Sequence, residues 1–159
     1  MRSVIEYGGI TWIDIQDPGK EDVDFLRGKF SFHPIVFEQL TRPSWATKVE
    51  TFPGHLFLVL FFPVYNKERR ETRPRELDLI VTKDTLITSH VQSNLPLKKL
   101  FDQCNLYEEP RKKYMEQGAS FLMYSLLHEL WEDSGVKIQR ISKKLEAIEE
   151  SIFQGREKE

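Results

Sequence analysis

The segment GASFLMYSLLHELWEDSGVKIQRISKKLEAIEESIF, residues 118–153, has the strongest influence on the fold because it predicts one long amphipathic helix. Nine of its residues follow one another at alternating steps of three and four, the spacing of helices that pack side by side. This row, called the seam below, consists of Tyr124, Leu127, Trp131, Ser134, Ile138, Ile141, Leu145, Ile148 and Ile152. Charges fill the other faces from Lys137 to Glu150, too many for a membrane-spanning helix. The seam needs a partner, so we expect the chain to be part of a larger protein.

Gly135 lies in the middle of this predicted helix. A glycine inside a helix costs about 1 kcal/mol relative to alanine. The sequence Asp133-Ser134-Gly135 could equally cap one helix and start another. We therefore expect a break or a bend at this point.

The composition predicts one folded domain followed by a helical extension. The 159 residues are 40% hydrophobic and 12% aromatic, which is enough for a hydrophobic core. A net charge of −2 argues against a general binder of nucleic acids or anionic membranes. The single cysteine, Cys104, is expected to be a small core residue because it lies at helical spacing from Leu100 and Phe101. The longest apolar run, 56–64, is far shorter than the ~20 residues of a spanning helix, so the fragment is expected to be soluble.

The first elements are a strand and two short helices. A strand at Thr11–Ile15 leads into a helix at Pro18–Phe30, because Asp17 can cap a helix and proline suits its first position. Pro34 starts a second helix that runs to Leu40, and residues 41–47 form a loop.

Four strands follow and form two hairpins, with turns at Pro53-Gly54 and Lys83-Asp84. The strands are expected at Lys48–Phe52, Leu56–Tyr65, Glu76–Thr82 and Thr85–Val91. Residues 66–75 between the hairpins are rich in lysine and arginine, and we interpret them as a solvated loop rather than a phosphate site. A helix at Pro96–Cys104 and a charged connection at 105–117 come next. The predicted fold class is α/β (α+β): a mostly antiparallel central sheet between helical layers, with a long C-terminal amphipathic helix or helix pair.

No pattern in the sequence points to an enzyme. The four histidines, at positions 33, 55, 90 and 128, are scattered singly, without the spacing that places two metal ligands on one helix face. The sequence contains no G-x-S-x-G and no glycine-rich phosphate loop. We therefore predict a protein that is not an enzyme.

A set of short sequence motifs in a fixed order points to a particular protein family. They are Trp12-Ile13-Asp14, Phe32-His33-Pro34-Ile35 with Glu38, Lys48-Val49-Glu50, Leu56-Phe57-Leu58-Val59-Leu60, Glu76-Leu77-Asp78-Leu79-Ile80-Val81-Thr82-Lys83 and Phe121-Leu122-Met123-Tyr124-Ser125-Leu126-Leu127. The order and the amino-acid sequences of these motifs resemble those of the cytoplasmic N-terminal domain in the CorA family of magnesium and cobalt transporters. The resemblance covers about residues 11–153.

The resemblance implies an assembly larger than this chain. Family members are homopentamers in which the cytoplasmic domains form a funnel, and a stalk helix leads to two transmembrane helices joined by a Gly-Met-Asn loop. Residues 1–117 would be the α/β/α cytoplasmic domain, and residues 118–159 a helical extension toward a stalk and membrane region absent from this sequence. The full-length protein would lie in the cell membrane with this domain on the cytoplasmic side. The seam would face the stalk, and the fragment alone would not conduct ions.

The resemblance also implies a weak regulatory site for Mg²⁺, or for another divalent cation such as Co²⁺ or Zn²⁺. In the family the short helix after His-Pro often ends in Glu-Asp, and that Asp helps hold an ion between neighbouring subunits. Here the pair is Glu38-Gln39, and an amide oxygen is a weaker ligand than a carboxylate. The acid expected in the last helix is replaced by His128, although Glu132 and Asp133 follow one turn later. The candidate metal residues are Glu38, Glu132 and Asp133; the alternative is that each is an ordinary solvated acid.

The predicted function is the regulatory domain of a divalent cation transporter, which senses intracellular cation and couples it to the pore. Its partners would be its own stalk and membrane segments in a pentamer, with no nucleic acid and no small-molecule substrate bound by the fragment. Two alternatives stay open: a zinc-transporting branch of the same superfamily, and a stand-alone module that binds a partner helix through the seam.

Overall fold

The computed structural model describes residues 1–66, 69, 71–91 and 95–153. Six strands form one sheet in the order β1-β2-β6-β5-β4-β3. The elements are β1 (Arg2–Tyr7), β2 (Ile10–Gln16), α1 (Lys20–Lys29), α2 (Pro34–Gln39), β3 (Lys48–Phe52), β4 (His55–Asn66), β5 (Glu71–Val81), β6 (Thr85–His90), α3 (Leu95–Leu106), α4 (Glu108–Met115) and α5 (Ala119–Phe153).

The sheet is mostly antiparallel, as predicted, and both predicted hairpins are present. β3 pairs with β4 and β5 with β6 in antiparallel register, and β4 pairs with β5. The exception is β2, which lies parallel to β6 and joins the N-terminal strands to the hairpins.

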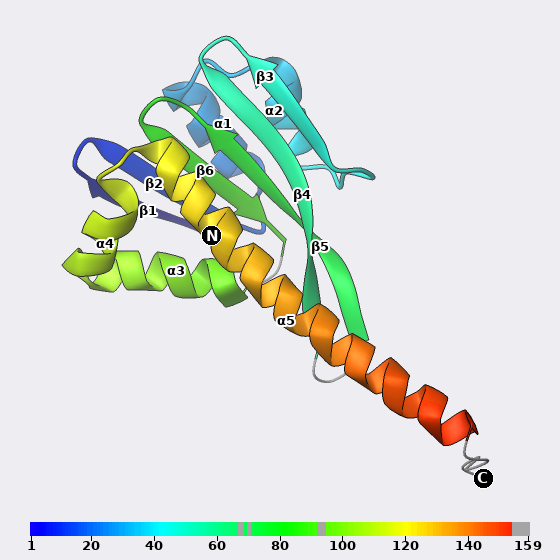
Figure 1. Ribbon diagram of the computed structural model, residues 1–159. Coiled ribbons are helices and arrows are strands. Elements are labelled where there is room, and N and C mark those ends of the chain that lie inside the picture. The colour runs from blue at the N-terminus through cyan, green and yellow to red at the C-terminus, as the bar shows by residue number, and fades with distance from the viewer. Residues whose placement is uncertain (67–68, 70, 92–94, 154–159) are drawn as a thin grey trace.

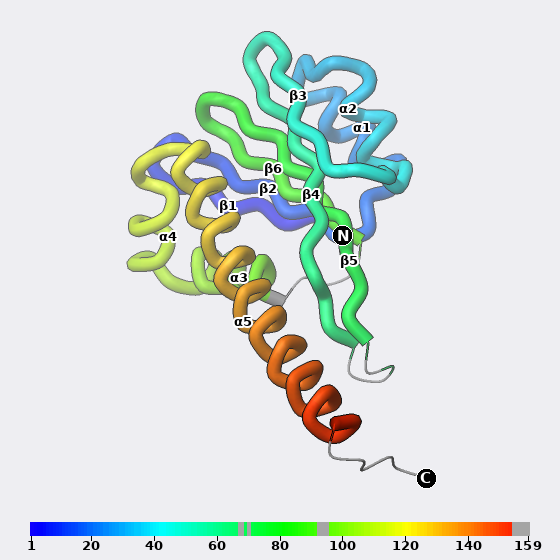
Figure 2. The backbone as a smooth tube through the Cα atoms, turned by 45° about the vertical axis from the view of Figure 1, so that its right-hand side comes forward, coloured from blue at the N-terminus to red at the C-terminus, as the bar shows by residue number. Residues whose placement is uncertain are grey.

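Helices cover both faces of the sheet because its strands alternate between two apolar cores. Trp12, Leu79 and Leu86 pack with residues of α3, α4 and α5. Ile13, Ile80 and Ile87 point to the opposite face and pack with α1 and α2. Figures 1 and 2 show α3, α4 and α5 on one side of the sheet and α1 and α2 on the other. The predicted sheet between helical layers is confirmed.

Cys104 of α3 is buried in the core that α3 shares with α4, α5 and the sheet, as the helical spacing predicted. Burial raises the pKa of its thiol to about 11, with Arg111 acting in the opposite direction. The thiol is therefore protonated at neutral pH, which suits a packing role rather than a reactive one.

Two elements were not predicted. β1 pairs with β2 through a turn at Gly8 and Gly9, whose φ angles of 58° and 80° suit glycine. The expected connection at 105–117 contains α4 instead. Its first turn carries Glu108 and Glu109 and its last turn Lys112 and Lys113, an arrangement that complements the helix dipole.

Several predicted boundaries differ from the structure by one or more residues, and two of the differences have a clear physical reason. The first helix begins at Lys20 rather than Pro18, because Asp22 closes its start by accepting a hydrogen bond from the Gly19 N–H at 3.1 Å. Part of the expected loop at 66–75 belongs to β5, which continues to Glu71 by pairing with β4. Lys67 and Arg70 of that predicted basic loop lie outside the described residues.

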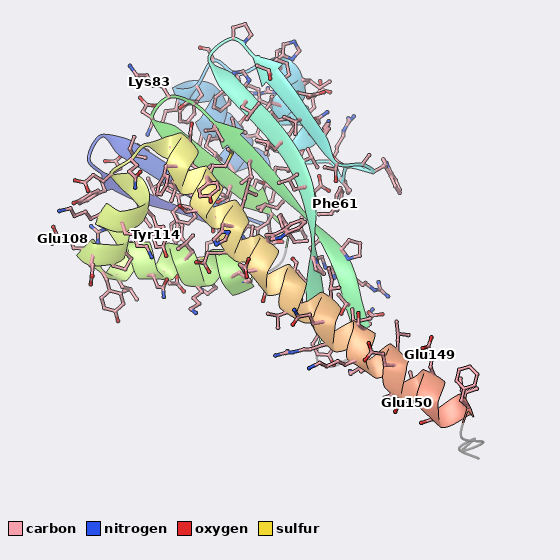
Figure 3. The ribbon with its side chains drawn as sticks, in the orientation of Figure 1. Phe61, Lys83, Glu108, Tyr114, Glu149 and Glu150 are labelled. Atoms are coloured by element: carbon pink, nitrogen blue, oxygen red, sulfur yellow. The ribbon has the colours of Figure 1, made fainter. Side chains whose placement is uncertain are left out.

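α5 is one continuous helix, so the expected break at Gly135 does not occur. The helix starts after Gly118, whose φ of 104° turns the chain. Leu122, Leu126 and Leu130, called the anchor row below, lie in the core. The second half leaves the sheet and projects away from the domain (Figure 1). In Figure 3, Glu149 and Glu150 mark this projecting end.

Candidate functional site

The seam of α5 is largely exposed. Trp131 is 73% exposed and Leu145 is 55% exposed, and Tyr124, Ile138, Ile141, Ile148 and Ile152 are also exposed. Leu127 and Ser134 are half-buried, and the Ser134 hydroxyl donates a hydrogen bond to the Leu130 carbonyl within the helix at 2.7 Å. The first half of α5 therefore has two apolar rows: the anchor row is buried in this chain, and the seam is not.

The ammonium group of Lys137 holds the middle of α5 against the sheet. The Lys137 Nζ donates a hydrogen bond to the Pro63 carbonyl of β4 at 2.7 Å and also forms an ion pair with Asp133 one turn earlier. This contact lies just beyond the anchor row. The direction of α5 is consequently set by buried leucines and by one charged contact to β4.

Glu38, the first candidate metal residue, is exposed in the last turn of α2. Val36 and Phe37 bury the other side of this short helix. Pro34 begins the helix, and the Nδ1 atom of His33 accepts a hydrogen bond from the Ile35 N–H at 3.3 Å. The neighbouring Gln39 is half-buried, and its Oε1 atom is buried without a hydrogen-bond partner among the described residues.

Glu132 and Asp133 lie on α5 and border a shallow pocket of about 520 Å³ between α3 and α5. Glu129 and Lys99 also line this pocket, as does Tyr114 of α4, which is labelled in Figure 3. Glu132 is exposed, whereas Asp133 is already paired with Lys137. Asp133 is therefore less available to a cation than Glu132 is.

The structure does not bring the three candidate metal residues together in one chain. Glu38 is on α2 and the two α5 acids are on the other side of the sheet, as Figures 1 and 2 show. Within the described part of the chain, no three His, Cys, Asp or Glu side chains form a group that could hold a metal ion. A single ion therefore cannot contact Glu38 and the two α5 acids of the same chain.

A second pocket, not anticipated from the sequence, lies on the face covered by α1 and α2. We call it the Asp78 pocket; its volume is about 470 Å³, and it is lined by Gln39, Ser44, Glu76, Asp78 and Ser89 among others. Phe61, labelled in Figure 3, also borders it. The Ser44 N–H donates hydrogen bonds to both carboxylate oxygens of Glu76, at 3.1 and 2.9 Å. These bonds tie the segment after α2 to β5.

Asp78 is the unusual group of this pocket. The pKa of its carboxyl is raised to about 8, mainly by burial and then by the charge of the neighbouring Glu76 and a hydrogen bond to it, while Lys48 acts in the opposite direction. Asp78 is therefore largely protonated at neutral pH and donates to Glu76. The sequence contains a clue: an aspartate between Leu77 and Leu79 in a strand that is covered on both faces must be buried.

A further polar contact joins the two parts of the sheet. Asp14 of β2 accepts a hydrogen bond from the Thr88 hydroxyl at 2.5 Å and lies 3.4 Å from the Nε2 atom of His90. The indole N–H of Trp12 donates to the same Thr88 oxygen at 3.2 Å. This network stabilises the parallel pairing of β2 with β6.

The fold is an α/β sheet covered by helices on both faces, from which one helix projects with an exposed apolar seam. Residues 7–159 match the family described as CorA-like Mg²⁺ transporter protein. The chain belongs to this family, whose members are transport proteins rather than enzymes.

Curated relatives match nearly the whole chain. The cobalt/magnesium transport protein CorA of Thermotoga maritima is 29% identical over 155 residues, which cover 94% of this chain and 42% of that protein. A putative metal ion transporter of Bacillus subtilis, YfjQ, is 26% identical and is matched over 88% of this chain and 41% of its own length. The chain therefore spans about two fifths of the length of these relatives.

Solved structures share the fold. The soluble domain of CorA from Methanocaldococcus jannaschii superposes with a TM-score of 0.72 at 21% identity, covering 92% of this chain and 56% of that one. The full-length CmaX protein also gives a TM-score of 0.72, at 16% identity, with 94% and 44% covered. In the chain described here, no helix among the placed residues combines the length and apolar character needed to cross a membrane.

Proposed function

We propose that this chain is the cytoplasmic regulatory domain of a CorA-type Mg²⁺/Co²⁺ transport protein of the cell membrane, and that it couples the intracellular cation level to a pore. The observation that carries the proposal is the exposed seam on a helix whose first half is anchored in the core. Such a helix can transmit movement of the domain to whatever packs on its seam. In the proposed full-length protein, the seam packs on the stalk, and five copies form a ring.

The two parts of the chain take different roles in this proposal. Residues 1–117 form the body that carries Glu38, and residues 118–159 form an arm leading toward the stalk and the membrane. The anchor row and the Lys137 contact to Pro63 make the junction of body and arm stiff. A rotation of the body is therefore passed along the arm rather than absorbed at a hinge.

Cation sensing is proposed to occur between neighbouring subunits. Glu38 is exposed on one face of the domain and Glu132 on the other, so two adjacent copies can bring acids from opposite faces together. Repulsion between these acids disfavours the closed ring, and a divalent cation removes it and shifts the population of gate states. Gln39 supplies at most a neutral oxygen and Asp133 is paired with Lys137, so binding is weak.

The test uses the full-length transporter in liposomes. Flux of Mg²⁺ is measured while the concentration of Mg²⁺ on the domain side is varied, for the natural protein and for the double variant Glu38→Gln with Glu132→Gln. We expect the variant to need a several-fold higher Mg²⁺ concentration for inhibition, because two ligands or repelling charges are lost. Asp24→Asn, an exposed carboxylate on α1, is the matched control. Equal inhibition curves for the double variant and the control would contradict the sensing role.

The same flux assay with Zn²⁺ in place of Mg²⁺ distinguishes a Mg²⁺/Co²⁺ transporter from a member of the zinc-transporting branch. A stand-alone helix-binding module is the second candidate, because the exposed seam also suits a helix from another protein. The natural reading frame decides between transporter and module: two apolar segments of about 20 residues after Glu159 support the transporter.

A further inference from the structure

We propose that β3 pairs in antiparallel fashion with β3 of a second copy of this chain, in a two-fold contact centred on Val49. The contact uses neither the seam nor Glu38 or Glu132. It goes beyond the proposed transport function and does not depend on it.

β3 is an edge strand with an open outer side. The sheet ends at β3, which pairs with β4 alone (Figure 1). Phe52 and His55 flank the two-residue turn between these strands, and residues in this position exchange both hydrogen bonds of their pair. Because bonded and non-bonded pairs alternate along the ladder, Val49 and Thr51 direct their backbone N–H and C=O groups away from β4. No other backbone group of the described residues bonds to these two, so the edge can accept a further strand.

The charges of β3 select both the partner and the register. Pairing two copies about Val49 places Lys48 of each copy opposite Glu50 of the other. Lys48 and Glu50 then form a non-hydrogen-bonded pair, in which side chains come closest and opposite charges attract. A shift of the centre to Glu50 would instead set two like charges face to face on the two-fold axis. A lysine in an edge strand normally opposes pairing, but this register gives it a carboxylate.

The single chain leaves these two charges poorly matched. Glu50 is half-buried, and its Oε2 atom is buried without a hydrogen-bond partner among the described residues. Buried polar atoms in folded proteins are almost always bonded. Lys48 points to the same face as Glu50, and its Nζ atom lies 5.6 Å from the centre of the Phe57 ring, a weaker contact than one with a carboxylate. A second copy supplies a partner of opposite charge for each.

Two exposed apolar side chains add to this contact. Val49 is 60% exposed and would meet Val49 of the second copy on the axis. Trp45, three residues before β3, is 99% exposed. The same register carries the segment of Trp45 toward Pro53 in the turn of the second copy. Exposed tryptophan is a frequent centre of binding energy in protein contacts.

The opposite edge of the sheet, β1, is less available. Arg2 forms an ion pair with Asp22 at 3.2 Å, and its guanidinium lies 3.8 Å from the centre of the Phe25 ring. α4 also packs near β1. β1 therefore serves as the control edge.

The test is sedimentation equilibrium of the 159-residue chain at concentrations up to about 1 mM, because a contact of one short strand is small and weak. We expect a monomer–dimer equilibrium. Val49→Pro removes an outward N–H but no bond to β4, so it should weaken dimerisation by about tenfold or more while the circular dichroism spectrum is unchanged. Val4→Pro makes the same change on the outer side of β1 and should dimerise as the natural chain does.

Exchange of the charges tests the register. Lys48→Glu and Glu50→Lys each place like charges opposite one another and should prevent dimerisation, whereas an equimolar mixture of the two variants should form mixed dimers. No association up to about 1 mM, or no recovery in the mixture, would overturn the proposal. Association that is lost in Val4→Pro or Leu145→Ala but kept in Val49→Pro would also overturn it, by placing the contact at β1 or at the seam. Neither result bears on the flux experiment, which tests Glu38 and Glu132.

Discussion

Asp78 makes the stability of the domain depend on pH. Its carboxyl has a pKa near 3.8 in the unfolded chain and about 8 in the folded one, because burial disfavours the charged form. Between these values the folded chain holds a proton that the unfolded chain releases. The contribution of Asp78 to stability is therefore fully present below about pH 3.8 and is lost as the pH rises through about 8.

The Asp78→Asn variant removes this dependence. We expect the variant to be more stable than the natural chain, with a difference that grows from pH 5 to pH 8. Urea unfolding at several pH values measures the free energy of unfolding for both. Curves that stay parallel across this range would show that Asp78 does not bind the extra proton.

His55 makes stability depend on pH in the opposite direction. Its ring stacks on Phe52 at 4.9 Å and lies 4.8 Å from the ring of Phe32, and its Nδ1 atom is 3.3 Å from the Pro53 carbonyl. Burial lowers the pKa of His55 below 6.5, and the nearby His33 lowers it further. The unfolded chain thus takes up a proton first, so stability is fully present above about pH 6.5 and falls as the pH drops below that value.

We predict that His55→Gln is less stable than the natural chain at pH 7.5, by about 1 kcal/mol, because the ring contacts are lost. The difference should shrink at pH 5, where the natural chain loses stability and the variant does not. Unfolding followed by fluorescence at both pH values tests this, with the exposed His128→Gln as control. A difference that is the same at both pH values would contradict it.

At the scale of the element, Gly135 of α5 was expected to break or bend the helix and does not. Local sequence around Gly135 is compatible with a cap, yet the helix continues through it. A Cβ atom added at Gly135 meets no atom within 4 Å, and its φ is not positive. Gly118, by contrast, has a φ of 104° at the turn before the helix.

We therefore predict that Gly135→Ala stabilises the chain by up to about 1 kcal/mol. Gly118→Ala should destabilise it by more than that, because alanine is strained at this φ. Thermal and urea unfolding of both variants measure the effect. A loss of stability in Gly135→Ala would indicate a turn rather than a continuous helix.

At the scale of the whole molecule, α5 has one apolar row that is buried in this chain and another that is largely exposed. Leu126 is 0% exposed in the anchor row, and Leu145 is 55% exposed in the seam. Both are leucines on the same helix, so the same substitution compares the two surfaces directly.

Leu126→Ala should lower the free energy of unfolding by about 2–5 kcal/mol, because it leaves a cavity in the core. Leu145→Ala should change it by less than about 0.5 kcal/mol in the isolated chain. In the full-length protein, where we propose that the seam packs on the stalk, Leu145→Ala should instead lower the thermal stability measured in detergent. A large loss of stability in isolated Leu145→Ala would mean that the seam is already packed within the chain.

Much of the architecture could be predicted from sequence because its signals are local. The steps of three and four in the seam, the Pro53-Gly54 turn and the alternation around Leu77 each involve neighbours within a few residues. β1 and α4 were missed although local signals existed, namely the pair Gly8-Gly9 and the order of charges in α4.

The sequence by itself thus determined most of the strands and helices, although not β1 or α4, and the apolar seam along α5. Only the tertiary structure decided that α2 with Glu38 and α5 with Glu132 lie on opposite faces of the sheet, and that Gln39, Asp78 and Ser89 line one pocket. The physical reason is that periodicity reports the surroundings of a side chain along its own element. Which distant element lies across from it depends on strand order and on how the helices pack, and neither is encoded in the spacing of nearby residues.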